Sequence, residues 1–513
     1  MSVTLGDVGT WIARHAELTP MRVAIRFDDE EINYRDLSHL VADLCGVMRE
    51  HLALTDGARV AYLGANIPEA LALFFACART NLVFVPLNWR LAAPELAAIL
   101  EDCGASVLFV EDSAVSLARK LTHVLPQAPR VGIRTDAADF PGITHRPRAD
   151  PWKPATDPTR PLLIVYTSGT TGRPKGAVLT AEAVAINALN SIHMHTLTAA
   201  DRVLTCLPLF HVGGLNIQTT PAFAVGATVI LQRRFEPGPV LRAIADAKPT
   251  LIVLVPATLQ ALIESVEWAT TDLASLRAVT TGSTDVPREL IDAWYARGVP
   301  VIQVYGATET APLAIYQQID EAYASVGALG RVGLLTEVRL VNARGDDCTD
   351  GEAGEVWVRG AHVARGYWNN ADHAAFADGW FRSGDIAVRD PQGRFWFKDR
   401  GKNVIISGGE NIYPAELERI LSALPAVKEG AVVGQPDPRW GAVPIAVIVP
   451  RDANVSRAAI LQAFDGRVAR YKIPKAVIYV DALPRNVMGK VDLGALGALI
   501  KEESCVELKS SPP

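Results

Sequence analysis

Residues 166–176 read Tyr-Thr-Ser-Gly-Thr-Thr-Gly-Arg-Pro-Lys-Gly and follow the apolar run 162–165. Glycine adopts backbone angles closed to other residues, so such a segment can wrap an anion with its N–H groups and hydroxyls. It departs from the phosphate loop of nucleotide hydrolases, because two residues separate Gly172 from Lys175. The alternative is a flexible, polar surface loop. We predict a phosphate-binding loop of another type, formed by Thr167, Ser168, Gly169, Thr170, Thr171, Gly172 and Lys175.

Composition and charge indicate a globular, multidomain protein that acts on small molecules. The chain of 513 residues is long enough for several domains with large cores. Apolar residues make up 49% and charged residues 21%, close to the average for soluble proteins. The 50 Lys and Arg residues against 56 Asp and Glu residues give no electrostatic support for binding nucleic acid.

Cysteines and apolar runs bear on the compartment in which the protein works. The six cysteines are scattered without a C-x-x-C pair, so we expect them to be reduced and structural. The first residues lack the basic and apolar segments of a secretory signal, and no apolar run is long enough for a membrane span. The sequence therefore predicts a cytoplasmic protein, and it leaves a homodimer open.

Short apolar runs alternate with helical patterns along much of the chain, which predicts parallel sheet flanked by helices. The expected strands are 23–27, 31–34, 60–63, 83–86, 107–110, 162–166, 203–206, 228–231, 251–255, 278–281 and 301–305. The expected helices among the first of them are 36–47, 68–79 and 94–102. A stretch richer in β-structure follows at 337–341, 355–359 and 394–398, and a helix begins at Pro414.

The domain boundaries follow from a change in composition. Residues 135–160 are rich in Pro, Asp and Arg and indicate a linker, after which 166–176 opens the next unit. We predict a large N-terminal domain over 1–399, with subdomains at about 1–150 and 160–399, and a small C-terminal domain over 400–513.

Four further segments carry residues suited to a nucleotide. Tyr305-Gly306-Ala307-Thr308-Glu309-Thr310 offers an aromatic face for adenine, a glycine for close approach, a hydroxyl for phosphate and a carboxylate for Mg²⁺. Asp385 stands on a glycine turn, where a carboxylate can accept two hydrogen bonds from a ribose diol. Arg400 and Lys490 are cations on glycine-containing loops. Each segment alone would be an ordinary solvated turn, but their joint occurrence in this order favours function.

The segments 166–176, 305–310, 380–385, 399–418 and 484–490 together resemble the adenylate-forming superfamily of acyl-CoA synthetases, peptide-synthetase adenylation domains and luciferases. The resemblance covers nearly the whole chain. It implies an α/β fold with a large N-terminal domain of stacked α/β sheets plus a β-rich subdomain, and a small, mobile α+β C-terminal domain.

The resemblance also implies a reaction in two steps. A carboxylate attacks the α-phosphate of ATP and pyrophosphate leaves; a thiol, expected to be free CoA, then displaces AMP. The loop at 166–176 would hold pyrophosphate, Thr308 would donate to the α-phosphate and Glu309 would bind Mg²⁺. The residues implied at the nucleoside are Tyr305, Gly306, Asp385 and Arg400.

Lys490 would bridge the substrate carboxylate and the α-phosphate, which offsets the repulsion between two anions that must meet. It lies in the small domain, so the resemblance implies a hinge, which matches Lys402. Asn403 stands where relatives often have an acid, and this leaves the details of domain contact open.

Residues 207–216, Leu-Pro-Leu-Phe-His-Val-Gly-Gly-Leu-Asn, resemble the start of the acyl pocket in the acyl-CoA branch. The resemblance places His211 beside the carboxylate and the thiol path, in an orienting role. The glycines are expected to leave space for a long or flat tail. The implied pocket residues are His211, Val212, Gly213, Gly214, Gly282 and Ser283.

The acid itself is less determined. Peptide-synthetase relatives keep an acid in this region to pair with the substrate's ammonium group. Residues 207–218 contain none, so the resemblance disfavours amino acids as substrates. We expect a medium- or long-chain fatty acid, with an aryl or phenylpropanoid acid of the feruloyl or coumaroyl type as the alternative. Loading of a carrier protein, luciferase-like oxidation and a non-catalytic adenylate-binding protein are weaker alternatives.

Two other enzyme classes lack their motifs. A serine hydrolase would need G-x-S-x-G and a zinc hydrolase H-E-x-x-H, and the sequence contains neither. The close pair His193 and His195 is expected on a helix or at its end, without a catalytic function.

Overall fold

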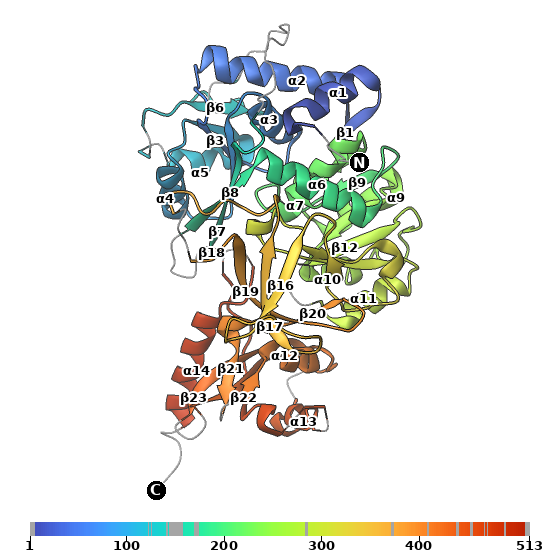
Figure 1. Cartoon of the computed structure of the whole chain (residues 1–513), viewed down its shortest axis with the longest axis vertical. Coiled ribbons are helices and arrows are strands. Elements are labelled where there is room, and N and C mark those ends of the chain that lie inside the picture. The colour runs from blue at the N-terminus through green and yellow to red at the C-terminus, as the bar shows by residue number, and fades with distance from the viewer. Residues whose placement is uncertain are drawn as a thin grey trace. The chain divides into compact units, whose positions relative to one another are not determined.

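The computed structural model describes residues 6–121, 123–124, 126–139, 142, 157–168, 174–282, 286–370, 374–407, 410–437, 441–451, 455–465, 467–468, 470–486 and 489–507 (Figure 1). The chain divides into two compact units. The first comprises 1–286, 290–338 and 357–383, and the second comprises 287–289, 339–356 and 384–513. Within the described ranges, no helix is both long enough and apolar enough to cross a membrane.

A nine-stranded sheet forms one half of the first unit, in the order β15-β14-β13-β12-β11-β9-β10-β1-β2. Its strands from β13 to β1 are parallel, and the edge strands β2, β14 and β15 are antiparallel to their neighbours. The strands are β1 (Val23–Phe27), β2 (Glu30–Asn33), β9 (Arg202–Thr205), β10 (Thr228–Leu231), β11 (Leu251–Leu254), β12 (Ala278–Gly282), β13 (Val301–Tyr305), β14 (Ile315–Tyr316) and β15 (Arg331–Val332).

A six-stranded sheet forms the other half, in the order β6-β5-β3-β4-β7-β8. It is parallel except for the β7–β8 pair. Its strands are β3 (Arg59–Leu63), β4 (Val83–Leu87), β5 (Val107–Glu111), β6 (Arg130–Ile133), β7 (Pro161–Ser168) and β8 (Pro174–Thr180). The helices of this unit are α1 (Trp11–Leu18), α2 (Tyr34–Gly46), α3 (Pro68–Arg79), α4 (Ala93–Cys103), α5 (Val115–Arg119), α6 (Ala181–His195), α7 (Val212–Asn216), α8 (Thr219–Val225), α9 (Pro237–Ala247), α10 (Pro256–Ile263) and α11 (Arg288–Tyr295).

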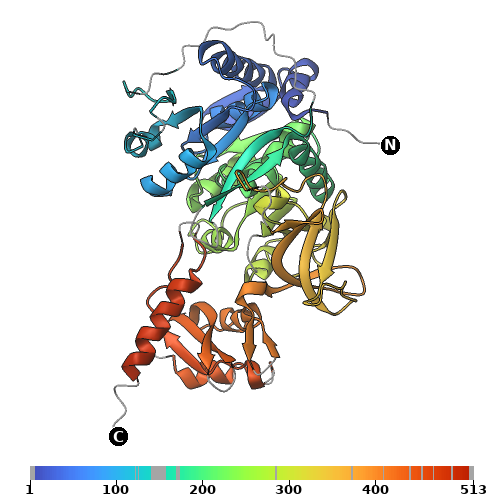
Figure 2. The same cartoon turned by 60° about the vertical axis from the view of Figure 1, so that its left-hand side comes forward.

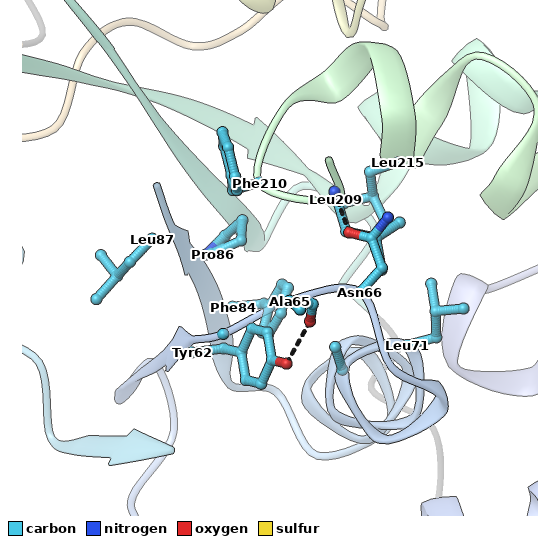
Figure 3. Close-up of a pocket in the computed structure, with 12 residues that line it drawn as sticks. Tyr62, Ala65, Asn66, Leu71, Phe84, Pro86, Leu87, Leu209, Phe210 and Leu215 are labelled. Carbon is cyan, nitrogen blue, oxygen red and sulfur yellow. Dashed lines mark hydrogen bonds between the residues drawn. The ribbon is translucent and has the colours of Figure 1, made fainter. Parts of the chain in front are cut away.

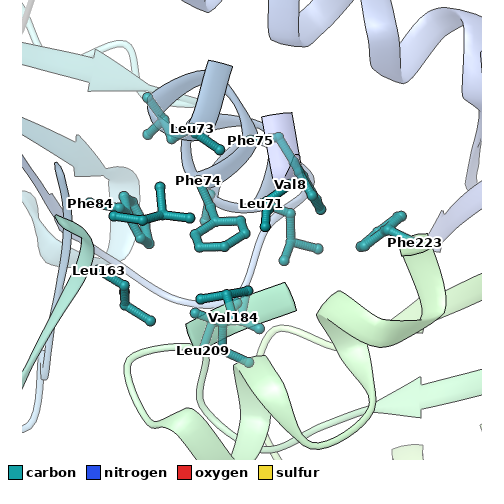
Figure 4. Packing of buried hydrophobic residues seen from close by; sticks show 14 of the residues in the cluster. Val8, Leu71, Leu73, Phe74, Phe75, Phe84, Leu163, Val184, Leu209 and Phe223 are labelled. Atoms are coloured by element: carbon teal, nitrogen blue, oxygen red, sulfur yellow. The ribbon is translucent and has the colours of Figure 1, made fainter. Parts of the chain in front are cut away.

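Helix α3 explains how the two sheets share one core. Its residues from Ala70 to Ala78 are all buried, and a helix that is apolar on every side belongs inside a protein. Phe74 packs edge-on against Phe84 of β4, and Phe75 packs edge-on against Phe223 of α8 (Figure 4). One cluster of buried side chains therefore joins residues from both sheets.

Sheet membership differs from what the order along the chain suggests. The segment expected to open a second subdomain, β7, pairs in parallel with β4 of the six-stranded sheet, through Leu163 opposite Phe84. Strands β1 and β2, expected with the first subdomain, lie in the nine-stranded sheet instead. Periodicity identifies a strand but not its neighbour, which is why alternation could not assign it to a sheet. The boundaries of the domains and subdomains stay a prediction.

A third sheet has five strands, in the order β16-β17-β19-β18 with β20 paired to β19. The division between the two units falls within β16, β17 and β19. The strands are β16 (Glu337–Val341), β17 (Ala353–Arg359), β18 (Phe376–Ala377), β19 (Trp380–Arg389) and β20 (Phe395–Arg400).

The second unit also holds a small α+β arrangement, with sheet order β22-β21-β24-β23 and β25 beside β24. Apolar residues of β23 and β24 belong to two clusters, one with α12 and α13 and one with α14. Helix α14, the red helix in Figure 2, lies beside this sheet. The elements are β21 (Ile405–Ser407), β22 (Glu410–Ile412), α12 (Pro414–Ser422), β23 (Val427–Asp437), β24 (Gly441–Pro450), α13 (Arg457–Gln462), β25 (Ala476–Tyr479) and α14 (Leu493–Glu507). The predicted α/β class, with a large N-terminal and a small C-terminal domain, is confirmed.

The two neighbouring histidines lie in the last turn of α6, as predicted. His195 is fully buried, with Nδ1 2.9 Å from the carbonyl oxygen of Ser191, and Nε2 2.9 Å from Oγ1 of Thr280 and 3.1 Å from Nε2 of Gln218. The neutral ring fits this set, because Nδ1–H can donate to the carbonyl while Nε2 accepts. Within the described residues, no group of three or more acidic, histidine or cysteine side chains could hold a metal ion.

Burial lowers the pKa of His195 to about 4 and that of His362 also to about 4. Because both folded-state pKa values lie below the unfolded value, the neutral rings stabilise the fold above about pH 6.5. Each contribution should disappear as the pH falls toward 4.

Between pH 6.5 and 4, wild type should therefore lose about 3 kcal/mol more unfolding free energy than His195→Gln does. Urea unfolding across this range measures it, with the exposed His123 as control (His123→Gln); equal pH dependence in both variants would contradict the assignment.

Candidate functional site

The predicted phosphate loop is the connection of an antiparallel hairpin. Thr167 lies opposite Lys175 and Ser168 opposite Pro174, so β7 and β8 continue into the segment that the sequence assigned to a single turn. Oγ1 of Thr167 donates to the carbonyl oxygen of Lys175 at 3.4 Å. Proline is tolerated at the first residue of a strand. Because strand propensity does not favour proline, the sequence pattern did not predict the start of β8. The predicted phosphate contacts at Gly169, Thr170, Thr171 and Gly172 lie outside the described residues.

After Tyr305, the last residue of β13, the chain passes very close to the backbone of Pro312. A Cβ at Gly306 would lie 1.6 Å from the carbonyl oxygen of Pro312, so only glycine fits without a backbone shift. Thr308 and Glu309 then form a 3₁₀ turn with Thr310. The main-chain N–H of Ala307 donates to Oγ1 of Thr310 at 2.9 Å, which holds this turn closed.

The hairpin and the turn at Glu309 meet at a residue that the sequence analysis missed. The hydroxyl of Tyr367 donates to Oε1 of Glu309 at 2.6 Å, and Nζ of Lys175 lies 5.4 Å from the centroid of the same ring. Glu309 is only 8% exposed and Tyr367 9%. The structure therefore brings together the predicted phosphate cation and the predicted Mg²⁺ ligand. The only signal in the sequence was an aromatic pair, Tyr367 and Trp368, directly after a glycine.

The segment 364–368 ties these parts together through its backbone. The N–H of Ala364 donates to the carbonyl oxygen of Glu309 at 2.7 Å. Farther along, the N–H of Val178 donates to the carbonyl oxygen of Gly366 at 3.1 Å, and the N–H of Trp368 donates to that of Gly176 at 2.7 Å. The segment thus runs along the free edge of β8 from the turn that carries Glu309.

The base of the hairpin is fixed by α4. The hydroxyl of Tyr166 donates to Oδ2 of Asp102 at 2.5 Å, and Nε1 of Trp368 donates to the carbonyl oxygen of Asp102 at 3.1 Å. Burial and the bond to Asp102 raise the pKa of Tyr166, so its hydroxyl stays protonated.

In the predicted acyl segment, His211 precedes α7 and contacts the ring of Phe210 at 4.6 Å between centroids. Val212 is buried, and Ser283 lies outside the described residues. The glycines serve different purposes. A Cβ at Gly214 would lie 2.3 Å from the carbonyl oxygen of Pro208.

Gly282 is equally tight, since a Cβ there would lie 2.3 Å from the carbonyl oxygen of Val304, whereas the nearest atom to a Cβ at Gly213 is 4.0 Å away. The expectation that all three glycines leave pocket space is therefore wrong for Gly214 and Gly282. These two allow backbones to pack closely.

Two small cavities flank this segment. One is lined by Phe210, Leu209 and Leu215 together with residues of β3, α3 and β4, and it includes the Tyr62–Ala65 and Asn66–Leu209 hydrogen bonds (Figure 3). The other lies among β9, β11, Gly214 and Gln218. Each has about 10 Å³ of free volume, which is room for about one water molecule.

Buried polar atoms without a hydrogen-bond partner also occur on this segment. Among the described residues they include Nδ2 of Asn216 and Oε1 of Gln218, which are 0% and 1% exposed. The Gln218 amide nitrogen donates to Nε2 of His195 and to Oγ1 of Thr280, both at 3.1 Å, so only its oxygen is unpartnered. Such atoms cost free energy unless something pairs with them.

The ribose and hinge predictions fall in the second unit. Asp385 of β19 lies directly opposite Arg400 of β20, so the structure brings together the two residues predicted at the ribose. Lys402 follows in the turn Gly401–Asn403, and the side chains of Arg400 and Lys402 lie outside what the structure describes. Oδ2 of Asp399 accepts from the N–H of Ala415 at 2.8 Å, where it caps α12.

Lys490 ends a tight turn in the second unit. The N–H of Asn486 donates to the carbonyl oxygen of Lys490 at 2.8 Å, and the N–H of Lys490 donates to Oδ1 of Asn486 at 3.1 Å. Arg485 braces the turn by donating to the carbonyl oxygen of Gly489 at 2.9 Å. The turn is held by backbone groups and by Asn486, so the Lys490 side chain is not needed to form it.

The chain is similar to known proteins in both sequence and fold. Residues 12–368 match the AMP-binding enzymes, and 416–490 match the C-terminal domain of AMP-binding enzymes. An indoleacetate–CoA ligase of Aromatoleum aromaticum is 45% identical over 98% of this chain and 99% of its own. A long-chain-fatty-acid–CoA ligase of Mycobacterium tuberculosis is 35% identical over 94% and 97%. The structure of o-succinylbenzoate CoA synthetase of Bacillus subtilis with its acyl-adenylate is similar with a TM-score of 0.84 and 30% identity, over 94% and 96%.

Proposed function

The chain belongs to the AMP-binding enzyme family, and we propose that the acid it activates is a compact aryl acid whose ring carries an N–H or a hydroxyl group. The chain is an acid–thiol ligase of the AMP-forming type, which uses ATP and CoA. The observation that carries the choice of acid is the 45% identity, over almost the full length of both chains, to a ligase named for indoleacetate.

The polar atoms beside the acyl segment support an aryl acid over a fatty acid. A saturated tail packed against Oε1 of Gln218 and Nδ2 of Asn216 would leave both atoms unpaired, at a cost of about 1 to 3 kcal/mol each. A ring N–H or hydroxyl group can pair with one of them.

A medium- or long-chain fatty acid is the second candidate, because a relative named for long-chain fatty acids is 35% identical. We place the aryl acid first on the higher identity and on the unpaired polar atoms.

The residue roles in the first step follow from charge. The acid's carboxylate oxygen attacks the α-phosphorus of ATP, and the bond from that phosphorus to the pyrophosphate oxygen breaks. Lys175, with the hydroxyl of Thr167 beside it, supplies positive charge and donors to the leaving pyrophosphate. Thr308 donates to the α-phosphate, and Lys490 offsets the repulsion between the two anions. These roles are proposals drawn from the motifs.

Glu309 fits the role of magnesium ligand. Its carboxylate is 8% exposed, and Oε1 is held by Tyr367. A buried carboxylate is stabilised by a cation, and oxygen ligands are those that Mg²⁺ prefers. Bound Mg²⁺ would supply charge stabilisation at the phosphates.

A substrate panel tests the choice of acid. We expect indoleacetate and hydroxycinnamates to give kcat/KM values at least about 10-fold above those of C8 to C16 fatty acids, because one paired polar atom contributes about 1.4 kcal/mol. Gln218→Leu should remove most of this difference by lowering kcat/KM for the aryl acids alone. The control is Gln260→Leu, which alters a partly exposed glutamine of α10. A wild-type preference for fatty acids would contradict the proposal.

A further inference from the structure

Tyr367 makes contacts that the family motifs do not explain. Its hydroxyl donates to Oε1 of Glu309 at 2.6 Å, and its ring lies under the ammonium group of Lys175 at 5.4 Å. One side chain thus contacts the residue proposed to hold Mg²⁺ and the residue proposed to hold pyrophosphate. Those two residues lie more than 130 positions apart in the sequence.

A tyrosine that only stabilised the fold would not need to contact both of these residues. A buried tyrosine hydroxyl needs a hydrogen-bond partner, and a backbone carbonyl would be enough. Here the partner is a carboxylate that is itself buried. In this bond the hydroxyl is the donor and the carboxylate oxygen is the acceptor. The donated bond therefore fixes the rotation of the carboxylate and leaves Oε2 for a cation.

The backbone around Tyr367 makes this contact rigid. Hydrogen bonds join Ala364 to the carbonyl oxygen of Glu309 at 2.7 Å and Trp368 to that of Gly176 at 2.7 Å. Tyr367 itself forms a β-bridge with Ala177, two residues beyond Lys175. The ring is thereby held between the hairpin and the 3₁₀ turn, with both ends of its segment anchored.

We propose that Tyr367 is a positioning residue that sets the geometry of the Glu309 carboxylate toward Mg²⁺ and of the Lys175 ammonium toward the pyrophosphate of ATP. The proposal rests on the proposed function. Replacing a residue that forms a hydrogen bond to a metal ligand typically lowers metal affinity by about 10- to 100-fold. The ring adds a cation–π contact that holds the lysine in place.

Two substitutions separate the two contacts. Tyr367→Phe removes the hydroxyl and keeps the ring, whereas Tyr367→Leu removes both. The matched control is Tyr34→Phe, which removes a buried tyrosine hydroxyl elsewhere in the same unit, one that donates to the carbonyl oxygen of Ala227 and not to Glu309. Binding of a non-hydrolysable ATP analogue, α,β-methylene-ATP, is measured by calorimetry at rising Mg²⁺ concentration and in EDTA, with thermal unfolding recorded for each variant.

Tyr367→Phe should raise the Mg²⁺ concentration for half-maximal binding of the analogue about 10-fold, with binding in EDTA unchanged. Tyr367→Leu should also weaken binding in EDTA, because Lys175 loses its support. Tyr34→Phe should leave the Mg²⁺ midpoint unchanged even where its thermal stability falls. An unchanged midpoint in Tyr367→Phe, or equal shifts in Tyr367→Phe and Tyr34→Phe, would overturn the role of Tyr367. If wild type does not bind the analogue at all, the proposed function itself fails, and the two failures are thus distinguishable.

Discussion

Lys490→Ala should lower the rate of acyl-adenylate formation by about 100- to 1,000-fold, the usual cost of removing one preorganised charge or donor from a transition state. The lysine is the cation proposed to lie between two anions that must come within bonding distance. The same variant should convert a supplied aryl-adenylate and CoA to the thioester within about 3-fold of wild type. Release of pyrophosphate measures the first half-reaction, and thioester absorbance measures the second.

The control for charge is Lys428→Ala, which removes an exposed lysine of β23 and should leave both half-reactions unchanged. The fold should survive Lys490→Ala, because the turn is closed by the backbone and by Asn486. Equal losses in both half-reactions would refute the assignment of Lys490 to the first step.

Glu309→Gln should lower adenylation by at least about 100-fold, because it removes the negative charge proposed to bind Mg²⁺ while keeping the shape of the side chain. The amide oxygen can still accept from Tyr367, so the local hydrogen bond is kept. The loss should be smaller at high Mg²⁺ concentration, and a Mg²⁺ titration of the initial rate measures this.

Glu321→Gln is the matched control for Glu309→Gln. Glu321 lies in the same unit and pairs with Arg331 at 2.9 Å, a surface ion pair of about 0 to 1 kcal/mol. Its loss should leave both the rate and the Mg²⁺ midpoint within about 2-fold of wild type. A Glu309→Gln enzyme with an unchanged Mg²⁺ midpoint would show that this carboxylate does not bind the metal.

Much of the fold follows from local sequence signals. Helix α3 begins at Pro68 and carries an apolar side chain at nearly every position, and each short apolar run expected between 60 and 305 is a strand. Strand β8 escaped prediction, because its first residues read as the end of a glycine-rich turn. The pairing of β7 with β4 was also not predicted, because long-range packing around α3 sets this pairing and no local pattern encodes it.

The residues of the candidate site also fall into those that the sequence could predict and those that it could not. Motif residues such as Thr308 and Glu309 could be predicted because their chemistry and order along the chain are distinctive, and their roles stay a prediction. Tyr367 was missed because its importance depends on two partners that are distant in sequence, Lys175 and Glu309. The tight packing of Gly214 and Gly282 was misread as pocket space, since sequence shows that a side chain is absent but not what fills its place.

The central claim is that the enzyme activates an aryl acid through AMP. The most direct measurement supplies ATP, Mg²⁺, CoA and indoleacetate or a hydroxycinnamate, and follows the nucleotide and thioester products by chromatography and mass spectrometry. We predict one AMP, one pyrophosphate and one aryl-CoA per turnover, with no turnover when the acid or CoA is omitted. Formation of ADP in place of AMP, or turnover with fatty acids and none with aryl acids, would contradict the account.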